Sequence, residues 1–187
     1  MDALQNASIF ATIRKTEGGN DMQRILIIGC GGAGKSTLAR QLGEKLDIPV
    51  VHLDKLFWHP GWVESSKAEI DEKIYAEMKK PQWIMDGNYN RTLAERIKHC
   101  DTVIYLDFSR WACLLGVLKR VLTTYGTVRP DMGAGCPERF DLDFLKWVWN
   151  YNRDKRENNY RLLNEAEGKT TIVLNNRRMV KRFLNSL

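Results

Sequence analysis

One segment of the chain has residue types and spacing that indicate chemistry directly. Residues 29–36 read Gly-Cys-Gly-Gly-Ala-Gly-Lys-Ser and match the phosphate-binding pattern G-x-x-x-x-G-K-[ST]. The glycines let main-chain N–H groups curl around a phosphate, the lysine would reach the β- and γ-phosphates, and the serine would coordinate Mg²⁺. We therefore expect ATP and Mg²⁺ to bind here, through Gly29, Gly31, Gly32, Ala33, Gly34, Lys35, Ser36 and Thr37.

The residues on either side of this segment support that interpretation. Residues 24–28 (Arg-Ile-Leu-Ile-Ile) form a short apolar run, which is typical of a strand buried on both faces. Downstream, Leu38, Leu42 and Leu46 recur at helical spacing and predict a helix. A strand, a glycine-rich turn and a helix N-terminus together form an anion-binding site, because the helix dipole favours negative charge at its start.

The alternation of strands and helices continues along the chain. Ser66 with Glu69 three residues later is a capping-box pattern that predicts the start of a helix. In the predicted helix at 111–123 we expect the leucines to face the core. Five short strands separated by helices imply a parallel α/β sheet with helices layered on both faces. Besides 24–28, the predicted strands are 50–53, 83–85, 102–106 and 171–174, and the other predicted helices are 66–80, 91–98, 142–166 and 177–187.

Composition narrows the classes of protein that this chain can be. Its 187 residues suit one well-packed domain, and no apolar run approaches the length of a membrane span. The net charge of +6 is compatible with a polyanionic small molecule or with nucleic acid. Four cysteines without metal-like spacing indicate reduced thiols and a cytoplasmic location. Residues 1–21 are weakly patterned, so we expect a loosely ordered extension before a domain at 22–187.

Polar residues follow several predicted strands, at the edge of a parallel sheet where ligands bind. Asp86, followed by a glycine, is the carboxylate that we expect to orient Mg²⁺, although it could instead cap the next helix. Asp107 could serve either role. Asp54 lies where an acceptor would meet the γ-phosphate, so it could be a general base or bind the acceptor, with a turn residue as the alternative. Trp58 could form the floor of an acceptor pocket or only pack its own loop.

Arginines are concentrated after residue 90, and four of them flank a glycine- and proline-marked loop at 125–140. Planar, permanently charged guanidinium groups suit the charge that develops on a transferring phosphoryl group. A loop bordered by them is typical of a lid that closes over a nucleotide, and the alternative is a solvated basic helix. These four residues are Arg120, Arg129, Arg153 and Arg156.

From residue 22 onward the chain resembles the P-loop kinases of the adenylate-kinase type, and especially the bacterial DNA topology modulation (FlaR-type) proteins. Residues 86–92 (Asp-Gly-Asn-Tyr-Asn-Arg-Thr) are similar to the Asp-Gly-Phe-Pro-Arg-Thr motif of adenylate kinases, with one residue inserted. The resemblance implies that Asp86 holds a Mg²⁺-bound water and that Arg91 contacts phosphate. It also implies that Arg120, Arg153 and Arg156 are lid arginines. The other segments that carry it are 27–37, 52–58, 60–62, 129–133 and 135–138.

The resemblance also implies a three-layer P-loop NTPase fold with a five-stranded parallel sheet of order 2-3-1-4-5, a short lid and a small acceptor-binding helical insert. The expected activity is Mg²⁺-dependent transfer of a phosphoryl group from ATP to a small-molecule acceptor. The alternative is a nucleotide-dependent regulator that binds nucleic acid (DNA topology modulation), although the chain shows no DNA-reading motif. We expect no membrane partner, and either a monomer or a homodimer.

The chain departs from adenylate kinases in the segment expected to bind the acceptor. Those enzymes use an arginine between strands two and three to grip the monophosphate, whereas this chain has no arginine from Gln41 to Asn90. We therefore expect AMP to be a poor acceptor and a hydroxyl-bearing or weakly charged molecule to be preferred. The loop at 125–140 holds only Cys136, which excludes a zinc-bearing lid. The residues expected to bind the acceptor are Asp54, Trp58, Arg91 and Arg129.

Overall fold

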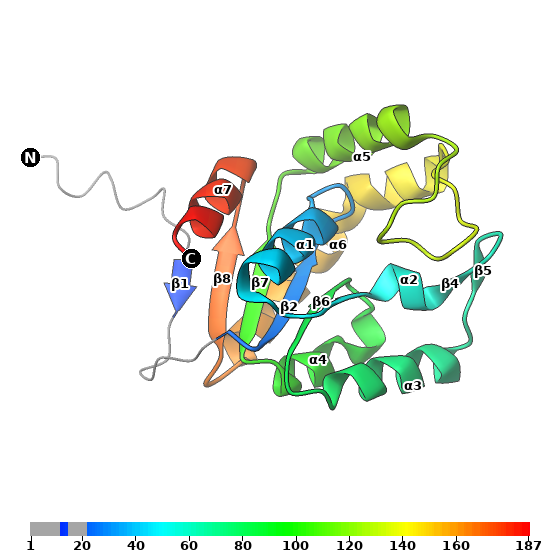
Figure 1. Ribbon diagram of the computed structural model, residues 1–187. Helices are drawn as coiled ribbons and strands as arrows, with labels where there is room; N and C mark the ends of the chain where they lie inside the picture. Colours follow the sequence, from blue (N-terminus) through cyan, green and yellow to red (C-terminus); the bar gives the residue numbers. More distant parts are fainter. Residues whose placement is uncertain (1–11, 15–21) are drawn as a thin grey trace, which may run out of the picture.

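A six-stranded sheet forms the centre of the computed structural model, which describes residues 12–14 and 22–187 (Figure 1). The strand order is β1-β8-β7-β2-β6-β3, and neighbouring strands are parallel except β1 and β8. The five parallel strands, numbered along the chain, confirm the predicted order 2-3-1-4-5. Their bounds are β2 (Arg24–Gly29), β3 (Val50–His52), β6 (Trp83–Asp86), β7 (Thr102–Leu106) and β8 (Thr170–Leu174), with β1 at Thr12–Arg14.

The predicted N-terminal extension lies mostly outside the described residues, which exclude 1–11 and 15–21. Its only placed segment is β1, which pairs antiparallel with β8 so that Thr12 is opposite Val173. The sequence pattern did not indicate this strand. Within the described part of the chain, no helix is both long enough and apolar enough to cross a membrane.

Helices connect the parallel strands and begin close to the predicted positions. The Ser66 hydroxyl accepts a hydrogen bond from the Glu69 N–H at 3.2 Å, as the capping pattern predicted. After β3 the chain also forms a short helix and a two-stranded hairpin, α2, β4 and β5. The bounds are α1 (Lys35–Leu46), α2 (Leu53–Phe57), β4 (Trp58–His59), β5 (Val63–Glu64), α3 (Lys67–Met78), α4 (Asn90–His99), α5 (Arg110–Thr124), α6 (Leu142–Glu165) and α7 (Arg177–Asn185).

β2 occupies the centre of the sheet because its apolar side chains can be buried on both faces. Ile25 and Ile27 join a core formed with α1, α5, α7 and the first half of α6. Leu26 and Ile28 point to the other face and join a second core with α3, α4 and the end of α6. Alternate residues of a strand point to opposite faces, so a continuous apolar run suits this two-sided burial. The start of the phosphate-binding segment is therefore fixed at the middle of the sheet.

The burial of α5 differs from the prediction. Its buried residues are Cys113, Val117 and Val121, and Leu114 packs beside them only in part. The leucines at 115, 118 and 122, which we expected to face the core, are exposed instead. Apolar residues lie on two sides of this helix, so helical spacing alone could not show which side meets the sheet.

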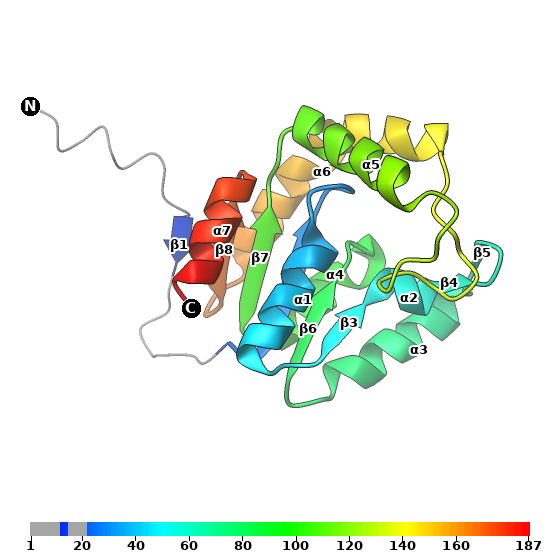
Figure 2. The same ribbon diagram turned by 45° about the horizontal axis from the view of Figure 1, so that its top comes forward.

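The loop at 125–140, which we call the lid segment, packs against the hairpin of β4 and β5 (Figure 2). The Gly61 N–H donates to the Gly135 carbonyl at 3.0 Å, and the Cys136 thiol donates to the His59 carbonyl at 3.1 Å. A side chain at Gly133 would lie 2.1 Å from the Trp58 carbonyl oxygen, so only glycine fits there. The lid segment and the hairpin together border the carboxyl edge of the sheet.

The turn that joins β6 to α4 is held by a buried arginine. Arg96 is completely buried and donates hydrogen bonds to the carbonyls of Gly87 and Tyr89, each at 2.9 Å, as well as to the carbonyl of Asn88. Burial lowers the pKa of this guanidinium to about 9, which leaves it charged at neutral pH. Tyr89 has φ +25°, a conformation that costs energy for a bulky residue and persists only where its surroundings fix it.

We expect the substitution Arg96→Met to lower the free energy of unfolding by about 3 kcal/mol, because it leaves several buried carbonyl groups without donors. Lys98→Met, at an exposed position on the same helix, is the matched control and should change it by about 0.5 kcal/mol or less. Urea unfolding monitored by circular dichroism measures both. Equal stability of the two variants would contradict the role of Arg96 in holding the turn between β6 and α4.

Candidate functional site

The phosphate-binding segment forms the turn between β2 and α1. Gly32 and Gly34 have φ values of +77° and +97°, which L side chains rarely adopt. A side chain at Gly32 would also lie 2.2 Å from the Cys113 carbonyl oxygen, so α5 closes one side of the turn. The helix α1 has no side-chain cap and no acidic residue in its first turn. Its N-terminal N–H groups are therefore available to an anion.

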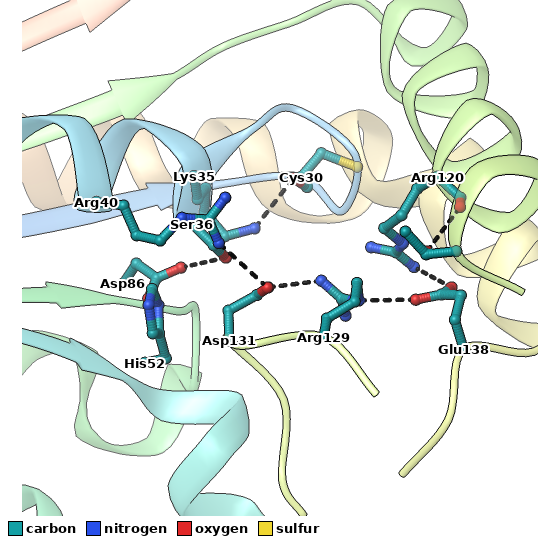
Figure 3. A network of polar contacts seen from close by, with 11 residues as sticks. Cys30, Lys35, Ser36, Arg40, His52, Asp86, Arg120, Arg129, Asp131 and Glu138 are labelled. Atoms are coloured by element: carbon teal, nitrogen blue, oxygen red, sulfur yellow. Dashed lines mark hydrogen bonds and ion pairs between the residues drawn. The ribbon is translucent and has the colours of Figure 1, made fainter. Parts of the chain in front are cut away.

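Lys35 and Ser36 occupy the first turn of α1, as the pattern requires. The Lys35 ammonium donates to the Cys30 carbonyl at 3.1 Å, which holds it over the turn (Figure 3). The Ser36 hydroxyl donates to the Asp86 carboxylate at 2.6 Å. The structure thus brings together the two residues predicted to hold the metal. A hydroxyl and a buried carboxylate are oxygen ligands of the kind that Mg²⁺ prefers, so this donor set fits the ion.

Two further side chains hold these groups in place. His52, at the end of β3, lies 2.5 Å from the second carboxylate oxygen of Asp86. Asn88 bonds to both main-chain groups of Gly29: its amide donates to the carbonyl at 2.9 Å, and its oxygen accepts from the N–H at 3.1 Å. Sequence analysis assigned neither residue to the site. Asn88 lay within the motif shared with adenylate kinases, and the alignment of His52 with Asp86 requires knowledge of the strand register.

A cavity of about 1350 Å³ extends along the edge of the sheet and is lined by the phosphate-binding segment and Asn88. Asp54, on α2, lines it together with Lys35, so the predicted base shares one cavity with the phosphate-binding segment. Asp54 is exposed in the open cavity, and the protein atoms around it raise the pKa of its carboxyl, against the opposing effect of the Lys35 ammonium. Tyr89 also lines the cavity, and burial and the nearby Asp54 carboxylate raise the pKa of its hydroxyl, so it remains a donor at neutral pH.

The lid segment carries positively and negatively charged side chains that form an ion-pair network at this cavity (Figure 3). Arg129 lies 2.5 Å from Asp131 and 2.8 Å from Glu138, and Arg120 of α5 lies 3.0 Å from Glu138. Arg40 of α1 approaches Asp131 at 3.5 Å. Burial opposes ionisation of Asp131, but the adjacent Arg129 guanidinium and other donors hold the pKa of its carboxyl below the usual value. Asp131 and Glu138 were not among the predicted site residues.

Two of the arginines predicted to act from the lid lie elsewhere, on the surface of α6. Arg153 is exposed and pairs with its neighbour Asp154 at 2.8 Å. Arg156 pairs with Asp107 at 2.8 Å and does not line the cavity. The structure therefore does not place either residue for phosphate contact, since α6 directs its inner face to the core and these positions outward.

Asp107 is engaged by Arg156 and Tyr160 rather than acting as a cap, and Ser109 caps α5 instead.

Two predicted acceptor-binding residues are also held outside the cavity. Arg91 pairs with Asp71 of α3 at 2.6 Å. The ring of Trp58 packs edge-on against Phe57 and Trp62, with centroids 4.8 and 5.4 Å away. Trp58 therefore packs its own loop, which was the second of the two roles that the sequence allowed. Arg129 and Asp54, the remaining predicted acceptor-binding residues, both line the cavity.

Comparison with known proteins shows which fold the chain has. A family model described as an AAA domain matches residues 25–109. No curated protein matches the chain. Among solved structures, shikimate kinase from Bacteroides thetaiotaomicron is 16% identical with a TM-score of 0.52, over 89% of this chain and 96% of that one. Shikimate kinase from Acinetobacter baumannii in complex with shikimate is 16% identical with a TM-score of 0.53, over 88% and 90%. The chain therefore has the fold of the P-loop kinases.

Proposed function

We propose that this protein is an ATP- and Mg²⁺-dependent phosphotransferase whose acceptor is a small molecule with a hydroxyl group. The observation that carries the proposal is the position of Asp54, which lines the same cavity as Lys35 and Ser36. A carboxylate beside the phosphate-binding segment can receive a proton from an attacking hydroxyl group. The same negative charge would repel an acceptor that brings a phosphate of its own.

In the proposed reaction the acceptor oxygen forms a bond to the γ-phosphorus while the bond from that phosphorus to the bridging oxygen breaks. ADP leaves with the electron pair, and the hydroxyl proton passes to Asp54. Mg²⁺, when bound through Ser36 and Asp86, supplies charge neutralisation for the phosphates. Lys35 binds the β- and γ-phosphates, and the main-chain N–H groups at the start of α1 orient them.

The cationic side chains that line the cavity support phosphoryl transfer rather than nucleotide binding alone. Arg120 and Arg129 reach it from two elements, α5 and the lid segment, and both are held by Glu138. Fixed guanidinium groups stabilise developing negative charge without reorganising during the reaction. A small-molecule acceptor also agrees with the name shikimate kinase, which both solved structures of similar fold carry. Whether the chain shares the specificity of FlaR-type proteins, or binds nucleic acid, stays a prediction from the sequence.

We expect Asp54→Asn to lower turnover about 100-fold or more while the affinity for Mg-ATP changes little, because the variant keeps its shape but loses the proton acceptor. Asp143→Asn, at an exposed carboxylate on α6, is the control and should leave both unchanged. A coupled assay of ADP formation with a panel of alcohols, nucleosides and nucleotides measures turnover, and calorimetry measures affinity. Efficient phosphorylation of AMP that survives Asp54→Asn would refute the proposed acceptor chemistry.

The pH dependence of turnover follows from the environment of Asp54. Only the ionised carboxylate accepts a proton, so turnover is lost as the pH falls through the pKa of this group. Because the protein atoms around the cavity raise that pKa, we expect the acidic decline at a pH above the value of about 4 that is usual for aspartate. The pH profile of kcat tests this. A decline near pH 4, or one that persists unchanged in Asp54→Asn, would contradict the assignment.

Asp86 and Asp107 should respond differently to the same substitution. Asp86→Asn can still accept a hydrogen bond from Ser36 but lacks the charge for Mg²⁺, so we expect turnover to fall strongly with little change in melting temperature. Asp107→Asn breaks the pair with Arg156, so we expect lower stability with nearly normal turnover of the folded protein. Paired kinetic and thermal-melting measurements distinguish them. The opposite pattern would move the metal role to Asp107.

A further inference from the structure

The outer side of α5 and its C-terminal cap carry a row of exposed apolar side chains, which we call the α5 stripe. It consists of Trp111, Leu115, Leu118, Leu122 and Tyr125, which are 63, 62, 39, 83 and 67% exposed. The opposite side of the same helix packs into the core. A helix that is apolar on two sides is typical of one that is covered on both. Single exposed leucines are ordinary, but a continuous row of this length marks an interaction surface.

The size of this surface approaches that of a protein–protein contact. The five side chains expose roughly 600 Å² of mainly apolar area, against about 800 Å² per partner in a standard interface. Trp149 of α6 extends the stripe at one end, because its ring packs edge-on against Trp111 with centroids 4.9 Å apart. Arg110 lies over the Trp149 ring at 5.0 Å, so a cation borders this end of the surface. Aromatic residues and arginine are the types enriched at interfaces.

The order of side chains along the stripe favours a second copy of the same chain as the partner. Leu118 lies at the centre, with Leu115 three residues before it and Leu122 four residues after it. Trp111 lies seven residues before the centre, and Tyr125 lies seven residues after it. If two such helices run antiparallel about a two-fold axis at Leu118, each aromatic end meets the aromatic end of the partner. A two-fold interface requires a surface that is complementary to itself, and this spacing provides it.

We propose that the α5 stripe pairs with the α5 stripe of a second copy, so that the protein is a two-fold dimer in solution. The buried side of α5 presents Arg120 to Glu138 and the cavity, so pairing through the outer side leaves the nucleotide site open. Figure 2 shows α5 along the outside of the molecule, with the lid segment leading away from its end. The contact would therefore include Tyr125, the first residue of each lid segment. The inference does not depend on the proposed function.

Sedimentation equilibrium tests the dimer without any assay of activity. We expect a mass of twice 21.6 kDa at micromolar concentration. Leu118→Glu should raise the dissociation constant at least about 100-fold, because it buries two carboxylates at the two-fold axis. Tyr75→Glu, at an exposed apolar position on α3, is the control and should remain dimeric. A monomeric wild-type protein, or a Leu118→Glu variant that dimerises as well as the wild type, would overturn the proposal.

Cysteine cross-linking tests the geometry. The four native cysteines are all buried, so an introduced surface thiol reacts alone. Leu118→Cys should form a disulfide between copies under mild oxidation by diamide, because the two residues meet at the axis. Leu122→Cys should link far less, since antiparallel pairing separates the two positions by about 12 Å along the helices. Equal linkage at both positions, or none at residue 118, would overturn the two-fold arrangement.

Discussion

The carboxylate of Asp86 lies between two hydrogen-bond donors that come from different parts of the fold. Ser36 approaches one oxygen from the start of α1, and His52 approaches the other from the end of β3. His52 and Asp86 are register partners of the parallel pair β3–β6, so the sheet itself sets their distance. A shift of one residue in that register would turn one side chain to the opposite face and leave a buried carboxylate with one donor fewer. The position of the Ser36 hydroxyl, the proposed Mg²⁺ ligand, therefore depends on strand pairing.

The charges of the lid segment limit what the cavity can accept. Asp131 and Glu138 neutralise Arg129 within the segment, and Glu138 also holds Arg120 of α5. Half-buried guanidinium groups such as these benefit from partners, because an unpaired charge away from water is destabilising. The carboxylates keep the arginines in position but also reduce the positive potential near Asp54. A cavity balanced in this way is consistent with the proposed pairing of Mg²⁺-bound ATP with an acceptor of low charge.

The sequence predicted the structure best in segments where the residue pattern indicates both a local structure and a chemical role. The glycine-rich segment and its flanking strand and helix predicted the phosphate site, the apolar runs predicted the five parallel strands, and the resemblance to P-loop kinases implied their order. Residues whose roles depend on tertiary packing were not found: Asn88 binds Gly29 across the sheet edge, and Asp131 acts through a loop without regular spacing. Arg153 and Arg156 were assigned from nearness in sequence to the lid, but the rotation of α6 about its axis directs them away from the cavity.

The error at α5 has the same origin and a consequence for the site. Helical spacing led us to expect the leucine side to be buried, but α5 is apolar on two sides and the side with Cys113, Val117 and Val121 packs into the core. The side left exposed ends at Tyr125, which forms a bridge with Glu138, and the next residue, Gly126, donates to the Glu138 carbonyl at 2.9 Å. Glu138 in turn holds both cavity arginines. The outer side of α5 therefore ends at backbone that pairs with Glu138, so this surface and the two cavity arginines meet at one end of the lid segment.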